Sequence, residues 1–380
     1  MKAIGWHPKR FLAAFRRGRW TWATLITGAA GGGLMALTGL PGAWITGSML
    51  AVASAALSGM PTRLPVPLVS VAFVCIGVSM GAGVTPETLA RLPSWPVSLA
   101  LVAVSVPIIA GAIFFFLTRR AKWDAPTAML SALPGALSFL LALAPSTKAD
   151  IPRVATLQST RVAMLVAVLP VAAVWLSDPA PAQVAETLLI GLDGALLLAV
   201  GGIGAAILAH LLSVPAGLLV GGLAASAALH GFGLINGVIP EVVTVCGFVV
   251  LGTMIGTRFL SVTWSALAGI LVVSLESFAI GATIAAAMAL ATAAITGLEV
   301  LKLLLAFAPG GLEAMVVLAF ALDLDPAFVA AHHLARFLLI ALLAPLVFQR
   351  LGMMQVAQAP SGDKAIASPP QGTQMDEKRA

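Results

Sequence analysis

Long runs of apolar residues alternate with short polar connections along almost the whole chain. Each run has 16 to 29 residues, and about 20 apolar residues in a helix cross a hydrocarbon core of roughly 30 Å. The alternating order that is typical of membrane β-strands is not seen. The pattern predicts an all-α polytopic membrane protein with helices in twelve segments: 20–39, 43–60, 65–83, 96–117, 125–144, 154–176, 186–212, 215–230, 240–259, 263–291, 301–322 and 327–348.

The second half of the chain repeats the first. A shift of 175 residues places Pro134 on Pro309 and Arg161 on Arg336. The same shift also matches Pro65 with Pro240, Gly77 with Gly252, Gly81 with Gly256 and Asp150 with Asp325, and a shift of 174 matches Gly28 with Gly202 and Pro41 with Pro215. Matched proline, glycine, aspartate and arginine at one register indicate an internal duplication of six segments each.

The fifth segment of each half contains a Pro-Gly pair near its middle. Proline removes a backbone donor and clashes with the preceding turn, and glycine adds backbone freedom. If this segment crosses the bilayer, each half has six crossings and the halves are parallel. If it re-enters, each half has five and the halves are inverted, which places Lys148 and Arg153 inside and Asp323 and Asp325 outside, as the positive-inside rule expects. We therefore expect about ten transmembrane helices, two Pro-Gly-broken re-entrant segments and inverted repeats.

Composition and charge exclude a soluble globular protein. Hydrophobic residues make up 60% of the 380 residues and charged residues 9%, whereas about a quarter of a soluble domain is charged. The net charge is +6, and six basic residues stand at the N-terminus, which indicates a cytoplasmic anchor on anionic lipid and not a nucleic-acid surface. The expected organisation is a basic cytoplasmic segment (1–19), membrane repeat 1 (20–176), a linker (177–185), membrane repeat 2 (186–348) and a polar, disordered cytoplasmic tail (349–380).

The two Pro-Gly breaks are the main candidates for a solute site. Backbone groups freed at membrane depth persist where they line a cavity or bind a solute, although a kink buried by neighbouring helices is the alternative. Arg161 and Arg336 lie within apolar segments, where an unpaired charge costs about 2.5–3.5 kcal/mol on insertion scales. They would bind an anion there, or form structural ion pairs with Glu313 or Glu276. The predicted substrate-binding residues are Pro134, Gly135, Ser138, Gln158, Arg161, Pro309, Gly310, Gly311, Glu313, His333 and Arg336, and the predicted ion-coupling residues are Glu276 and His332.

Signatures of cofactor chemistry are missing from the sequence. There is no phosphate-binding loop and no HExxH or CxxC motif, so we expect no cofactor, no metal and no enzymatic activity. The glycine-rich runs 28–33 and 201–204 favour close helix packing over dinucleotide binding. Asp193, His210 and His230 stand near span ends, where they can reach the interface.

The residues around the breaks resemble those of the AbrB-type membrane protein family. The resemblance rests on Pro41–Gly47, on both Pro-Gly breaks and on the arginine after each, and it covers about residues 20–350. Members are also labelled AbrB family transcriptional regulator or putative ammonia monooxygenase, and the first label implies regulation of gene expression. The family commonly has Ser-Pro-Gly-Gly at both breaks, whereas this chain has Leu133–Ala136 and Ala308–Gly311, so it lacks the serine hydroxyls there.

These observations favour a secondary transporter of a small polar or anionic solute that works by alternating access, with H⁺ or Na⁺ as candidate coupling ions. A membrane-embedded ligand sensor that regulates gene expression is the second hypothesis, and a monooxygenase is the least favoured. The expected location is the inner or plasma membrane, with many passes and both termini cytoplasmic. The expected partners are the solute and the lipid bilayer, without direct nucleic-acid binding, and a homo-oligomer is left open.

Overall fold

The computed structural model describes residues 18–83, 92–134, 147–176 and 189–353. Every predicted apolar segment contains helix within this part of the chain. The helices are α2 (Arg19–Ala36), α3 (Ala43–Leu57), α4 (Val66–Gly81), α6 (Trp95–Arg119), α7 (Ala125–Ala132), α9 (Ile151–Leu176), α10 (Leu192–Leu211), α11 (Gly217–Gly231), α12 (Glu241–Thr257), α13 (Trp264–Thr296), α14 (Val300–Phe307), α15 (Leu312–Ala321) and α16 (Pro326–Arg350), with the 3₁₀ turns η1 (Leu92–Ser94) and η3 (Arg258–Ser261).

The predicted boundaries differ from the observed ones by a few residues at most helix ends. In segment 186–212, which is described from residue 189, the helix begins at Leu192, and segment 263–291 continues to Thr296. Segment 301–322 is not one helix, because it divides into α14 and α15 at the Pro-Gly break, as the sequence predicts. The predicted linker 177–185, residues 1–17 of the basic segment and residues 354–380 of the tail lie outside the described residues.

The composition of the helices is that of a multi-pass membrane protein. Six helices in the described residues are long and apolar enough to cross a membrane, and four more apolar helices are shorter. Large apolar side chains cover their outer faces; on α10, Leu196 is 66% exposed and Val200 is 69% exposed. In water such a surface would be an aggregation patch, whereas lipid tails solvate it.

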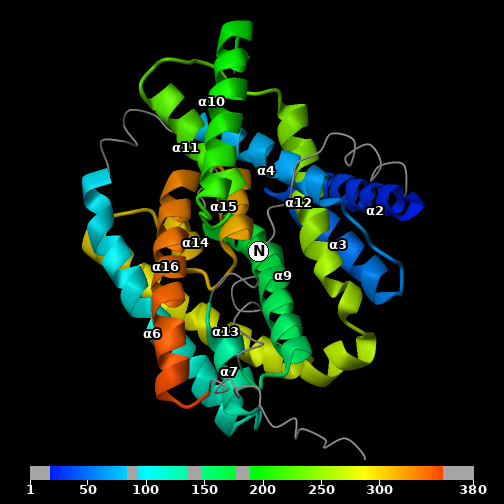
Figure 1. The fold of residues 1–380 in the computed structure, drawn as a ribbon, viewed down its shortest axis with the longest axis vertical. Coiled ribbons are helices and arrows are strands. Elements are labelled where there is room, and N and C mark those ends of the chain that lie inside the picture. Colours follow the sequence, from blue (N-terminus) through cyan, green and yellow to red (C-terminus); the bar gives the residue numbers. More distant parts are fainter. Residues whose placement is uncertain (1–17, 84–91, 135–146, 177–188, 354–380) are drawn as a thin grey trace, which may run out of the picture.

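The helices form two bundles, and each bundle takes helices from both halves of the chain (Figure 1). The first bundle contains α2, α3, α4, α10, α11 and α12, and it occupies the upper and right part of the view. The second bundle contains α6, α7, α9, α13, α14, α15 and α16. The helix pairings recur as the duplication predicts: α2 packs on α3 as α10 packs on α11, and α4 packs on α11 as α12 packs on α3.

Close contacts at glycines show the relative direction of helices from the two halves. A Cβ on Gly77 would lie 2.3 Å from the Leu219 carbonyl oxygen, and Gly81 of the same helix faces Ser226. Helices α4 and α11 therefore run parallel. The equivalent pair is also parallel, because Gly252 of α12 meets the Ile45 carbonyl oxygen at the same 2.3 Å and the next glycine along, Gly256, meets the next turn of α3. These approaches confirm that small residues mediate helix packing here.

Neighbouring helices within each half run antiparallel. On α2, Gly31 faces Gly47 of α3, and on α11, Gly217 faces Ala209 and Gly221 faces Ala205 of α10. The predicted packing role of residues 28–33 is therefore confirmed. In the run 201–204, Gly202 packs on Val78, whereas Gly204 has nothing within 4 Å.

Candidate functional site

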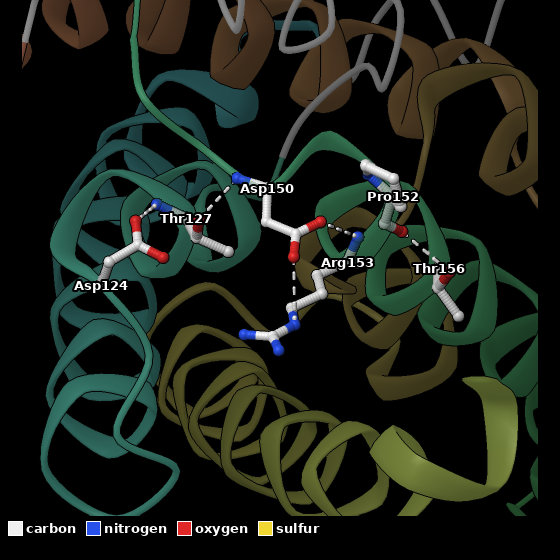
Figure 2. Close-up of polar contacts among 6 residues, drawn as sticks. All are labelled: Asp124, Thr127, Asp150, Pro152, Arg153 and Thr156. Carbon is white, nitrogen blue, oxygen red and sulfur yellow. Dashed lines mark hydrogen bonds and ion pairs between the residues drawn. The ribbon is translucent and has the colours of Figure 1, made fainter. Parts of the chain in front are cut away.

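The broken segment of the first half starts beside the start of α9. Asp124 caps α7 by accepting a hydrogen bond from the Thr127 amide at 2.9 Å, and the Thr127 hydroxyl oxygen accepts one from the Asp150 amide at 2.8 Å (Figure 2). Asp150 in turn accepts a hydrogen bond from the Arg153 amide and pairs with its guanidinium at 3.2 Å. These bonds hold the first turns of α7 and α9 side by side.

Three contacts along α7 and α9 fix their relative direction. Thr127 meets Asp150, Leu130 meets Gln158, and Leu133 meets Arg161. Both residue numbers rise together, so α7 runs parallel to α9 until it ends near the middle of that helix. The chain then reaches Thr147, next to the start of α9, through residues 135–146, which lie outside the described residues.

The second half has the same arrangement with its break fully described. Lys302 lies over the Phe328 ring at 4.7 Å, His333 bonds the Leu305 carbonyl oxygen at 2.9 Å, and Arg336 bonds that of Ala308. Helix α14 therefore runs parallel to α16 and ends near its middle. Helix α15 then runs back, because only residues 322–325 join its end to the start of α16. Residues 308–311 are thus the tip of a helical hairpin.

Arg161 binds the end of α7, where the break leaves carbonyl groups without a helical partner. Its Nη2 donates to the Leu133 carbonyl oxygen at 3.2 Å and to the Gln158 side-chain oxygen, and Nη1 reaches the Ser131 carbonyl oxygen at 3.4 Å. The Gln158 amide nitrogen donates to the carbonyl oxygens of Leu130 at 2.9 Å and Leu133 at 3.1 Å. Arg161 is 2% exposed, so these carbonyls supply its polar surroundings.

Arg336 binds the free carbonyl groups at the end of α14 in the same way. Its Nη1 donates to the Ala308 carbonyl oxygen at 2.5 Å, and its Nη2 donates to the Gly310 carbonyl oxygen and to His333 Nδ1, both at 2.7 Å. Because Nδ1 accepts this bond, His333 carries its hydrogen on Nε2 and donates it to Leu305. A neutral imidazole thus takes the place of the Gln158 amide, 175 residues later.

A cavity of about 1010 Å³ extends to the start of α15, directly after the tip of the second hairpin. Leu312 and Glu313, the first residues of α15, form its inner wall. The remaining wall comes from the starts of α2 and α4, the α10–α11 connection and the end of α12. Polar side chains that line it include Thr62, Arg63 and His210. The Thr62 hydroxyl is buried and has no hydrogen-bond partner among the described residues.

Comparison with known proteins identifies the relatives of this duplicated fold. Residues 44–352 match the family model described as Transition state regulatory protein AbrB. The chain belongs to the AbrB family. No curated protein matches it. The matched region of this AbrB-family protein contains both breaks, both buried arginines and most of the cavity wall.

The predicted counter-charges of the buried arginines are wrong. Arg161 and Arg336 bind main-chain carbonyls, and no carboxylate pairs with either one among the described residues. Partial negative charge at the ends of α7 and α14 supplies their partner, as at any helix C-terminus. Their like charges also lie within electrostatic range of each other. Glu276 is half-buried on α13, and it forms no ion pair in the part of the chain that the structure covers.

Glu313 lies near a cation that the sequence reading did not single out. Arg258 of η3 is within electrostatic range of Glu313, and both are half-buried. Lys302 of α14 was also missed, and it is 8% exposed. Both residues are single basic positions inside predicted apolar segments, so the signal that identified Arg161 and Arg336 could have found them.

The remaining predicted residues are distributed over both breaks. Pro309, Gly310 and Gly311 form the described hairpin tip, and Pro134 follows α7 at the first break. Gly135 and Ser138 lie outside the described residues. His332 faces α6, away from its neighbour His333. His210 lines the cavity, and His230 bonds the carbonyl oxygens of Ser226 and Gly237.

Proposed function

We propose that this AbrB-family protein is a secondary transporter that moves a small polar or anionic solute by alternating access and does not convert it chemically. One observation carries the proposal: the first residues of α15, directly after the hairpin tip, line a large cavity with polar side chains. Half-helix ends beside a cavity at membrane depth are typical of solute sites in transporters. Arg161 and Arg336 bind uncharged carbonyls and have no carboxylate partner in the described residues, so their net positive charge favours an anionic solute near the breaks.

In this proposal the two halves cross the membrane in opposite directions. The parallel packing of α4 on α11 and of α3 on α12 supports it, because a duplication of six crossings would make these pairs antiparallel. With each broken segment counted as a hairpin that enters and leaves on one side, each half has five crossings. The chain then has ten transmembrane helices and two re-entrant hairpins.

The cavity opens on the cytoplasmic side in the proposed topology. Helix directions place the start of α4 and the end of α12 at one end of the fold, with the cavity mouth. That end carries Asp124 and Asp150 and a larger basic set: Arg19, Arg63, Arg119, Arg120, Lys122, Lys148, Arg153, Arg258 and Arg350. The opposite end carries Lys302 and an acidic set: Asp193, Glu241, Glu299, Asp323 and Asp325. By the positive-inside rule the basic end is cytoplasmic, and the structure corresponds to an inward-open state.

A ligand sensor is the second candidate, and the regulatory family description favours it. The same cavity would then hold a signalling ligand, with no net movement of that ligand across the membrane. Regulation of gene expression would pass through a partner protein. The two candidates differ in one measurable quantity, which is solute flux.

The test is uptake by purified protein in liposomes under imposed pH and Na⁺ gradients. Labelled lactate, succinate, phosphate and sulfate are suitable probes. We expect uptake of at least one anion, and its loss in Pro309→Ala with Gly310→Ala, because a continuous helix removes the hairpin tip. Pro345→Ala, which removes a proline from the unbroken helix α16, is the matched control and keeps uptake. Saturable binding without flux would favour the sensor. Full uptake by the double variant would show that the break is a structural kink that transport does not need.

A further inference from the structure

A buried polar cluster lies on the α14 side of the hairpin, among residues that the cavity does not reach. It consists of Lys302 of α14, His332 of α16 and Ser98 of α6, which are 8%, 0% and 0% exposed. Two aromatic rings enclose it: Phe328 lies 3.9 Å from the His332 ring, and Trp95 lies 6.3 Å from it, both measured between centroids. The internal repeat has Thr127, Leu157 and Val273 at the equivalent positions. The cluster is therefore not part of the duplicated framework.

The two adjacent histidines of α16 differ in their hydrogen-bond partners. His333 donates from Nε2 to Leu305 and accepts at Nδ1 from Arg336. A second proton on His333 would oppose the guanidinium hydrogen, so this ring is held neutral. Its repeat partner Gln158 performs the same two tasks and has no basic nitrogen.

His332 instead has an acceptor beside each ring nitrogen. Nδ1 lies 2.7 Å from the Phe328 carbonyl oxygen, which only accepts, so Nδ1 carries a hydrogen. Nε2 lies 2.8 Å from the Ser98 hydroxyl oxygen, and that hydroxyl is also 2.9 Å from the Trp95 carbonyl oxygen. A neutral His332 accepts the Ser98 hydrogen. A protonated His332 donates to Ser98, which then turns its hydrogen to Trp95. Both states are fully hydrogen-bonded.

We propose that His332 is the proton-binding group that couples anion transport to proton movement, an inference that rests on the proposed function. In the conformation of the transport cycle that admits water to the cluster, the imidazole takes one proton from water at Nε2. The Ser98 hydroxyl then rotates toward the Trp95 carbonyl oxygen, and the site gains one positive charge. Water on the other side of the membrane receives the proton after the conformational change. Ser98 is the positioning residue, because its hydroxyl can be donor or acceptor.

The charges around His332 link proton binding to anion binding. Lys302 faces it from α14, and His333 and Arg336 share its helix; α6 contributes the uncharged Ser98 and Trp95. All the charged neighbours are basic, so a proton on His332 adds a further cation to a buried site. An anion bound in the cavity beside the hairpin tip offsets that charge. By linkage, the proton strengthens anion binding to the same extent, which predicts symport of an anion with a proton.

The first test observes the proton directly and needs no solute. Imidazole ¹⁵N spectra of the full chain in lipid nanodiscs contain the signals of five histidines. The variants His332→Gln and His333→Gln each remove one signal and so assign those of His332 and His333. On acidification we expect the His332 signal to change from neutral to doubly protonated, while the His333 signal keeps its Nε2–H form. In Ser98→Ala the His332 transition should move, because its acceptor is lost. A His332 signal that stays neutral until the protein unfolds would overturn the proposal.

The second test measures coupling in liposomes with an entrapped pH dye and the labelled anions named above. Wild-type protein should acidify the lumen as the anion enters, at least several-fold faster than His332→Gln. Gln keeps neutral hydrogen-bonding groups but takes up no proton. The matched control is His230→Gln, at a half-buried histidine outside the cluster, and it should acidify the lumen at the wild-type rate. Anion uptake with equal proton flux in His332→Gln would refute the proton site alone, whereas no uptake by wild-type protein would refute the transporter.

Discussion

Arg161 and Arg336 perform one task at equivalent positions of the two repeats. Each guanidinium lies buried at the end of a short helix and donates to the carbonyls that the Pro-Gly break leaves free. Five fixed N–H groups suit this task, because a planar fork can reach two carbonyls and a side-chain acceptor at once. Each arginine thereby joins the end of a short helix, α7 or α14, to the long helix behind it.

This assignment predicts how Arg336 variants behave. Arg336→Gln should lower the free energy of unfolding by about 1–3 kcal/mol, because buried carbonyls lose their donor. Arg336→Lys should also be destabilised, since one ammonium cannot make all three contacts. Adding Glu313→Gln should restore nothing, because Glu313 is not the partner of Arg336. Thermal unfolding in detergent measures the effect, and rescue by the second substitution would show an ion pair instead.

At the scale of elements, close helix contacts hold the first bundle together. Gly77 and Gly252 are repeat equivalents, and each lets its helix approach a carbonyl of the other half. The absence of a side chain matters here because the backbone, and not a movable side chain, occupies the space a Cβ would need.

Alanine substitutions of glycines should therefore lower or raise the stability of the protein according to whether another helix lies against the position. Gly77→Ala and Gly252→Ala place a Cβ 2.3 Å from a carbonyl oxygen, and we expect each to cost about 3 kcal/mol or prevent assembly. The matched control is Gly204→Ala on α10, where nothing lies within 4 Å. It should stabilise its helix by about 0.5–1 kcal/mol. Yield and thermal stability in detergent report both, and equal effects at the three positions would contradict the close approach of the helices at Gly77 and Gly252.

At the scale of the whole molecule, the short helices α7 and α14 start at opposite ends of the fold. Lys148 lies at the end where α7 starts and Asp323 at the end where α14 starts, and both residues are exposed. If the basic end is cytoplasmic, these two positions face opposite sides of the membrane.

Cysteine labelling tests this topology. In a chain with Cys75 and Cys246 replaced by serine, Asp323→Cys should react with a membrane-impermeant thiol reagent in intact cells. Lys148→Cys should react only after the membrane is opened. Labelling of both from one side would contradict the inverted arrangement, whereas labelling with the sides exchanged would invert only the proposed orientation.

The sequence by itself determined the membrane class, the helices, the duplication and the breaks. These properties depend on local apolar runs and on the positions of proline and glycine, so they can be inferred from composition and residue spacing. The resemblance at the breaks also led to the correct family. The sequence also indicated three residues of the site at the breaks, because a charge or amide within an apolar run needs a partner: Arg161, Arg336 and Gln158.

Only the tertiary structure decided what those partners are. The sequence offered Glu313 and Glu276 as the counter-charges if the arginines form ion pairs, because a sequence pattern shows side-chain charges and not carbonyl dipoles. The partners in the structure are the freed ends of α7 and α14. The parallel packing of α4 on α11, the hairpin course of α14 and α15, and the different surroundings of His332 and His333 depend on contacts between segments far apart in the chain. Adjacent residues on a helix point about 100° apart, so their chemistry is set by what the fold brings to each side.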